Sequence, residues 1–140
     1  MNSFAHYSFG AVCEWMLNDL AGIQSDGPGY EKIVIKPHPP TIGSNPVREP
    51  IHWVKAHYDS IHGRIASNWK QTKDKFELET EIPANTTAIV YLPASTADQI
   101  TEGGKPLAKV PVVKFLRMEG TYGVLAVESG KFYFTSKTAR

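Results

Sequence analysis

The chain has 140 residues, which is enough for one domain with a sizeable hydrophobic core. Its 15 basic and 14 acidic residues leave a formal net charge of +1, and the Lys and Arg residues form no cluster, so nucleic acids and anionic membranes are not expected as partners. The apolar runs are too short for a transmembrane helix, and no export signal follows Met1. The sequence leaves the cellular location open between periplasmic or secreted and cytoplasmic.

The first predicted element is a helix that ends near Ala21. Gly22 follows the last periodic residue and suits a left-handed C-terminal cap, which favours a residue without a Cβ atom. Apolar residues three and four positions apart form one face of this helix: Phe9, Val12, Met16 and Leu20.

A second apolar stripe lies beside the first and consists of Phe4, Tyr7, Ala11 and Trp15. More than half of the helix circumference therefore needs burial, and one sheet cannot cover it. Since no second helix is predicted, we expect this segment to be the last helix of a larger helical domain that is not in this chain. Cys13, the only cysteine, is expected to be a buried, inert thiol in this helix. We also expect the chain to form a homodimer through the helix.

The remaining sequence predicts strands and turns. A turn over Ser25–Tyr30 precedes a strand that stops at Pro37, and a proline-rich irregular crossing spans His38–Pro50. Two strands then flank a hairpin turn at Ile61–Gly63.

The clearest alternation of the chain follows in DKFELETEIP, which predicts one buried and one solvent-facing side. Thr86–Leu92 is nearly continuously apolar and predicts a central strand buried on both faces. Two short strands around a Glu-Gly-Gly turn and three longer ones complete the chain. This pattern predicts an antiparallel β-sandwich of two sheets preceded by one α-helix.

Several long, ordered motifs run through the first two thirds of the chain. The motif F-x-H-Y-x-F-G-x-V-x-E-W, followed by A-G-I and D-x-P-G-Y-x-K-I-x-I-x-P, spans Phe4–Pro37. Y-x-S-x-x-G-R-I-x-S-x-W spans Tyr58–Trp69, and I-P-A-N-T-T-A-x-V-Y-L-P spans Ile82–Pro93. Together these motifs resemble the C-terminal part of the bacterial α-L-rhamnosidases of glycoside hydrolase family 78. The resemblance implies that residues 1–24 are the terminal helix of an (α/α)6 catalytic barrel and that residues 25–140 form a C-terminal β-sandwich.

The resemblance also implies an activity, the inverting hydrolysis of terminal α-L-rhamnose from glycosides. The general acid and the general base of that reaction belong to the barrel, so this chain is expected to contain no catalytic residue and to be inactive alone. His6 matches a family histidine that hydrogen-bonds the bound sugar and is the one candidate substrate-binding residue, although Ala5 replaces the usual Asn beside it. No cofactor is implied, and the histidine spacing predicts no metal site.

Other residues are weaker candidates for sugar binding or catalysis. His52 and Trp53, or Trp69, could form an aromatic platform for a sugar ring, but strand tryptophans are more often core residues, and we expect both tryptophans to point inward. Glu77, Glu79 and Glu81 resemble a row of catalytic carboxylates, but the alternation explains them better as a solvated face.

Two functional hypotheses remain at this point. The chain is either the C-terminal part of a rhamnosidase, whose sandwich supports the barrel, or a non-catalytic carbohydrate-binding or interaction module. Inward-pointing Trp53 and Trp69 would favour the first, and a pair of exposed parallel aromatic rings would favour the second.

Overall fold

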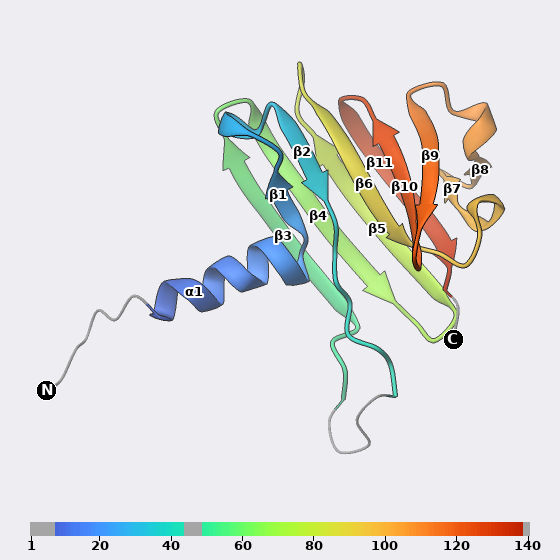
Figure 1. Ribbon diagram of the computed structural model, residues 1–140, viewed down its shortest axis with the longest axis horizontal. Helices are drawn as coiled ribbons and strands as arrows, with labels where there is room; N and C mark the ends of the chain where they lie inside the picture. Colours follow the sequence, from blue (N-terminus) through green and yellow to red (C-terminus); the bar gives the residue numbers. More distant parts are fainter. Residues whose placement is uncertain (1–7, 44–48, 139–140) are drawn as a thin grey trace, which may run out of the picture.

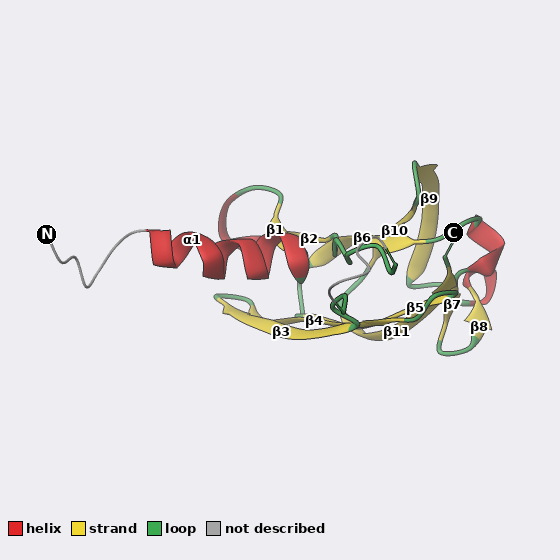
Figure 2. Ribbon diagram, turned by 90° about the horizontal axis from the view of Figure 1, so that it is seen from below, coloured by secondary structure: helices red, strands yellow, loops and turns green. Residues whose placement is uncertain are grey.

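The strands form two sheets that stack face to face (Figure 2). The computed structural model describes residues 8–43 and 49–138. The five-stranded sheet has the order β1 (Ile23–Ser25), β2 (Lys32–Ile35), β6 (Thr87–Pro93), β10 (Tyr122–Val127) and β9 (Val113–Glu119). The six-stranded sheet has the order β3 (Trp53–Ser60), β4 (Gly63–Gln71), β5 (Lys75–Ile82), β11 (Gly130–Lys137), β7 (Thr101–Glu102) and β8 (Lys105–Pro106).

One helix precedes the sandwich. Its α-helical part, α1, spans Ser8–Trp15 and continues into a π-helical segment over Met16–Leu20. The helix ends as predicted, because Ala21 donates its N–H to the Met16 carbonyl at 3.0 Å and Gly22 adopts a φ of 79°. Figure 1 shows that α1 projects away from both sheets and meets the sandwich only at its C-terminal end.

The prediction of an antiparallel sandwich is confirmed, with one parallel pair, β2 with β6. Parallel neighbours need a long connection, and here that connection contains β3, β4 and β5 of the other sheet. The predicted Ile61–Gly63 turn joins β3 to β4, and Gly63 has a φ of 125°. The described parts of His38–Pro50 contain no helix or strand, as expected for the proline-rich crossing.

The alternation predicted for β5 is also present. Its even-numbered residues from Phe76 to Ile82 are buried, whereas Glu77, Glu79 and Glu81 lie on the opposite face. Strand β6 differs from its prediction: Ala88, Val90 and Leu92 are buried, but the side chains between them are only half-buried. The prediction of burial on both faces was wrong, because no layer of the described chain covers the outer face of the five-stranded sheet.

Strand β1 was not predicted as a strand at all. It has only three residues and pairs with β2 through Ile23–Ile35, Gln24–Val34 and Ser25–Ile33. The turn residues that follow it are the stronger sequence signal, so the pattern predicted only a turn.

The core lies between the two sheets and continues into the end of the helix. Leu20 belongs to the same buried cluster as the strand residues, and Leu17 packs partly against it. Its largest fully buried side chains include Trp69, Phe76, Phe134, Ile23, Ile33, Ile35, Ile65 and Leu78.

Two side chains of β4 bind the last helical carbonyl groups inside this core. The Trp69 indole donates its Nε1–H to the Leu20 carbonyl at 2.9 Å, and the Ser67 hydroxyl donates to the Ala21 carbonyl at 2.6 Å. Both bonds are buried. The end of a helix leaves carbonyl groups without intrahelical partners, so these donors allow the helix end to be buried against the sheet.

Gly22 brings the chain into close contact with the end of β2. Its carbonyl accepts a hydrogen bond from the Lys36 N–H at 2.8 Å. A Cβ atom at this position would lie 2.2 Å from the Lys36 carbonyl carbon and 2.2 Å from the Pro37 nitrogen. Only glycine fits here, for reasons of both φ and space.

Gly22→Ala is therefore expected to destabilise the chain by about 3 kcal/mol or more, from left-handed backbone strain together with overlap against Lys36 and Pro37. Gly104→Ala is the matched control, since Gly104 has a similar φ of 77° but a Cβ atom added there would meet no heavy atom within 4 Å. It should cost only about 1 kcal/mol. Urea unfolding followed by tryptophan fluorescence compares the two, and equal losses would show that the close contact has no effect.

Ser67→Ala is expected to cost about 1–3 kcal/mol, because it leaves the buried Ala21 carbonyl without its donor. Ser95→Ala is the control: Ser95 is exposed and its hydroxyl is 3.4 Å from the Lys137 carbonyl, so its loss should change stability by less than about 0.5 kcal/mol. The same unfolding experiment measures both variants. A Ser67→Ala protein as stable as the parent would exclude this bond as an anchor of the helix.

Candidate functional site

Among the described residues of the helix, three large apolar side chains are exposed. Val12 is 54%, Trp15 50% and Met16 52% exposed, and we call these three residues the helix surface. The expectation that this chain cannot cover its own helix is confirmed for the described residues. Large apolar side chains grouped in this way are typical of surfaces that bind another part of a protein.

Cys13 is exposed, so the prediction of a buried thiol was wrong. The sheets meet only the last turns of the helix, so no part of the described chain covers Cys13. His6, the predicted sugar contact, lies outside the described residues, and its role stays a prediction.

Polar contacts fix the direction in which the helix leaves the sandwich. The His38 Nδ1 atom lies 2.9 Å from the Asp19 carboxylate, and the His38 N–H donates to the Asp19 carbonyl at 3.1 Å. The Gln24 side chain donates to the Asn18 carbonyl at 2.8 Å. Together with the bonds from Ser67 and Trp69, these contacts hold the last helical turn from several sides.

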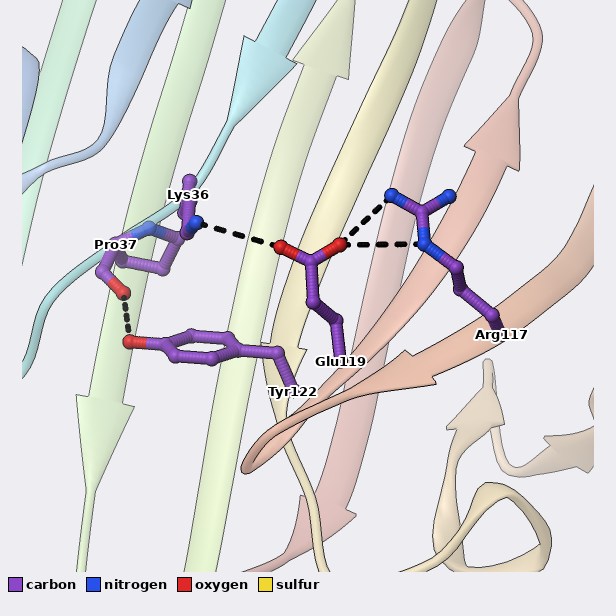
Figure 3. A network of polar contacts seen from close by, with 5 residues as sticks. All are labelled: Lys36, Pro37, Arg117, Glu119 and Tyr122. Carbon is purple, nitrogen blue, oxygen red and sulfur yellow. Dashed lines mark hydrogen bonds and ion pairs between the residues drawn. The ribbon is translucent and has the colours of Figure 1, made fainter.

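A further polar network crosses the outer face of the five-stranded sheet (Figure 3). The Lys36 ammonium lies 4.4 Å from the Tyr91 ring centroid and 4.0 Å from the Glu119 carboxylate, which in turn binds Arg117 at 2.7 Å. Tyr122 donates its hydroxyl to the Pro37 carbonyl at 3.1 Å, and burial, with a smaller effect from Asp19, raises the pKa of that hydroxyl. The network connects the segment after β2 to β9 and β10.

The outer face of the six-stranded sheet carries an open groove of about 320 Å³. We call it the outer-face groove. The side chains that line it come from β3, β4, β5 and β11 and include Trp53, Lys55, Asn68, Lys70, Glu79 and Tyr133. Glu77 lies in the same groove.

The two candidate tryptophans have opposite environments. Trp69 is 2% exposed, stacks on Phe76 with ring centroids 5.8 Å apart and is a core residue, as expected. Trp53 is 62% exposed, so the expectation that it points inward was wrong. It lies on the edge strand β3, outside the core cluster. Among the described residues no aromatic ring stacks on it, so the two tryptophans do not form a pair of exposed parallel rings.

Glu77, the first residue of the glutamate row, does not have the properties of a catalytic acid. Lys75 and the Tyr133 hydroxyl bind the Glu77 carboxylate at 2.6 and 2.8 Å. Both hydrogen bonds lower the pKa of Glu77. The bond between Tyr133 and Glu77 also raises the pKa of the Tyr133 hydroxyl. A general acid needs a carboxyl that keeps its proton near neutral pH, so Glu77 is unsuited to that role.

Metal sites and membrane-spanning helices are both absent from the described residues. No group of three or more His, Cys, Asp or Glu side chains in ranges 8–43 and 49–138 is arranged to hold a metal ion. Within the same ranges, the helix lacks the length and hydropathy needed to cross a membrane.

Comparison with known proteins gives one consistent result. The family model for the bacterial alpha-L-rhamnosidase C-terminal domain matches residues 22–106. An alpha-L-rhamnosidase from Streptomyces avermitilis is 36% identical over 137 residues, which cover 96% of this chain and 12% of that protein. Another from Formosa agariphila is 27% identical and covers 98% of this chain and 14% of that protein.

Solved structures agree with the sequence comparison. The crystal structure of the Streptomyces avermitilis alpha-L-rhamnosidase complexed with L-rhamnose matches 98% of this chain and 12% of that chain, with a TM-score of 0.79 and 34% identity. An alpha-L-rhamnosidase structure from Dictyoglumus thermophilum matches 99% of this chain and 15% of that chain, with a TM-score of 0.78 and 28% identity.

The chain therefore spans only 12–15% of the length of these relatives. The family model covers more than half of the chain, and the predicted resemblance is confirmed by sequence and by structure. The chain belongs to the family of bacterial α-L-rhamnosidase C-terminal domains.

Proposed function

We propose that this chain is the C-terminal module of an inverting α-L-rhamnosidase, in which the sandwich supports a catalytic (α/α)6 barrel. Residues 1–24 would form the terminal helix of the barrel and residues 25–140 the sandwich. The observation that carries the proposal is the helix surface: Val12, Trp15 and Met16 are exposed on a helix whose end is fixed in the sandwich core.

The helix surface would gain free energy from a partner. Burial of a large apolar side chain contributes about 1.5–3 kcal/mol, so covering these three side chains would favour docking substantially. A barrel helix from the same enzyme is a suitable partner, because neighbouring helices pack apolar side chains against each other. Because the helix end is fixed in the sandwich core, the barrel and the sandwich would then keep one relative orientation.

Inverting hydrolysis needs a particular pair of carboxyl groups. They stand about 6.5–9.5 Å apart, and one of them acts as an acid with a raised pKa. The pKa of Glu77 is lowered instead, because Lys75 and Tyr133 both bind its carboxylate, so Glu77 does not suit the role of the acid. We infer that the barrel supplies both catalytic groups and that His6 contributes a hydrogen bond to the rhamnose ring.

A chimera tests this proposal. The chain replaces the 137 aligned C-terminal-domain residues of the Streptomyces avermitilis enzyme, and release of the aryl alcohol from an aryl α-L-rhamnoside is measured. The chimera should hydrolyse the substrate, and the isolated chain should not. Turnover that stays with the purified isolated chain would contradict the proposal.

The helix surface is tested within the same chimera. Trp15→Glu should shorten the half-life of activity at a fixed elevated temperature by roughly tenfold, because a buried apolar contact is replaced by a charge. Leu116→Glu is the matched control, since Leu116 is 40% exposed on β9, at the opposite edge of the sheet from β1. Equal effects of the two variants would show that α1 has no special contact with the barrel.

In the absence of the barrel, the isolated chain is expected to form a homodimer through the helix surface. Sedimentation velocity over a range of concentrations should show a reversible dimer, and Trp15→Glu should shift the chain to monomer while Leu116→Glu leaves the dimer intact. A monomer at every concentration would exclude self-association as the way in which the helix surface is covered.

A further inference from the structure

The outer-face groove is independent of the helix surface, since its side chains come from the six-stranded sheet alone. We propose that this groove binds a neutral oligosaccharide. Such binding goes beyond the proposed function, because supporting a barrel requires no ligand on this face.

The strand register places the polar and aromatic side chains in two adjacent rows. Trp53 lies opposite Lys70, which lies opposite Glu77. In the neighbouring row, Lys55 lies opposite Asn68, Asn68 opposite Glu79, and Glu79 opposite Tyr133. Cross-strand neighbours on one face are close enough to contact the same ligand.

Aromatic side chains stand at the two ends of these rows. Trp53 on β3 is 62% exposed and Tyr133 on β11 is 44% exposed. Three strand spacings separate β3 from β11, which is about 14 Å. A single pyranose ring cannot contact both aromatic side chains at this separation, so the arrangement favours an oligosaccharide that lies across the strands. Aromatic faces meet the apolar C–H faces of such rings well.

The charges in the groove select a neutral ligand. Two lysines, Lys55 and Lys70, stand beside two glutamates, Glu77 and Glu79, so the lining has no net charge to attract an anion or a cation. Sugars instead need both donors and acceptors at short range, which these ammonium, carboxylate and amide groups provide.

Part of this polar set is already ordered and part is free to bind a ligand. Lys75 and Tyr133 both bind Glu77, which fixes the Tyr133 ring beside the groove. Among the described residues, the side chains of Lys55, Asn68 and Glu79 form no hydrogen bond with the protein. The paired strands already hold the backbone of these residues in place, so ligand binding needs to order only their side chains.

The experiment titrates the ¹⁵N-labelled full chain with three neutral trisaccharides, cellotriose, xylotriose and mannotriose, and with trigalacturonate as a charged probe. At least one neutral trisaccharide should shift the indole signal of Trp53 and the amide signals of β4 and β5 saturably. Trp53→Ala should weaken this binding about tenfold. Leu116→Ala is the matched control and should leave it unchanged, since Leu116 is 40% exposed but lies on β9 of the five-stranded sheet.

Asn68→Ala provides a second variant that removes an amide without removing an aromatic ring, and it should weaken binding severalfold while the far-ultraviolet circular dichroism stays that of the parent. Three results would overturn the proposal: no shift with any neutral trisaccharide at about 10 mM, binding that Trp53→Ala leaves intact, or tighter binding of trigalacturonate. None of these results depends on whether the chain supports a barrel, so the two proposals can fail separately.

Discussion

Burial of the helix end in the sandwich core is the interaction on which the rest of the structure depends. The last carbonyl groups of a helix need donors, and here Ser67 and Trp69 of β4 supply them from within the core. Gly22 then allows the chain to turn directly into β1 and to pass close to the end of β2. Helix and sandwich thus share one core without a linker, and the direction of the helix is determined by the sheets.

This arrangement gives the molecule two surfaces of different character. The helix surface is apolar and projects beyond the sandwich, so it resembles a surface that is normally packed. The outer-face groove combines side chains of balanced charge with exposed aromatic rings, so it suits a neutral sugar chain. On the outer face of the five-stranded sheet, the network of Lys36, Tyr122 and Glu119 links the segment after β2 to β9 and β10. Support of a barrel and binding of a sugar can therefore coexist on one domain.

The sequence predicted what depends on local pattern and did not predict what depends on the neighbouring layer. The alternation in β5, the turn at Ile61–Gly63 and the helix end at Gly22 are encoded by adjacent residues, and the structure contains all three. The environments of Cys13 and Trp53 were predicted wrongly, because residue type alone does not determine whether another element covers a side chain. The family resemblance was predictable because its motifs are long and ordered, whereas His6 lies outside the described residues and its role stays a prediction.

Native-state hydrogen exchange tests the shared core most directly. The Lys36 amide, which binds the Gly22 carbonyl at 2.8 Å, should exchange only through global unfolding, as slowly as the central amides of β6. The amides of α1, which projects away from the sandwich, should exchange much faster through fraying. If the Lys36 amide instead exchanged as fast as those of α1, the helix end would open locally, and the account of a helix fixed by the sandwich core would be wrong.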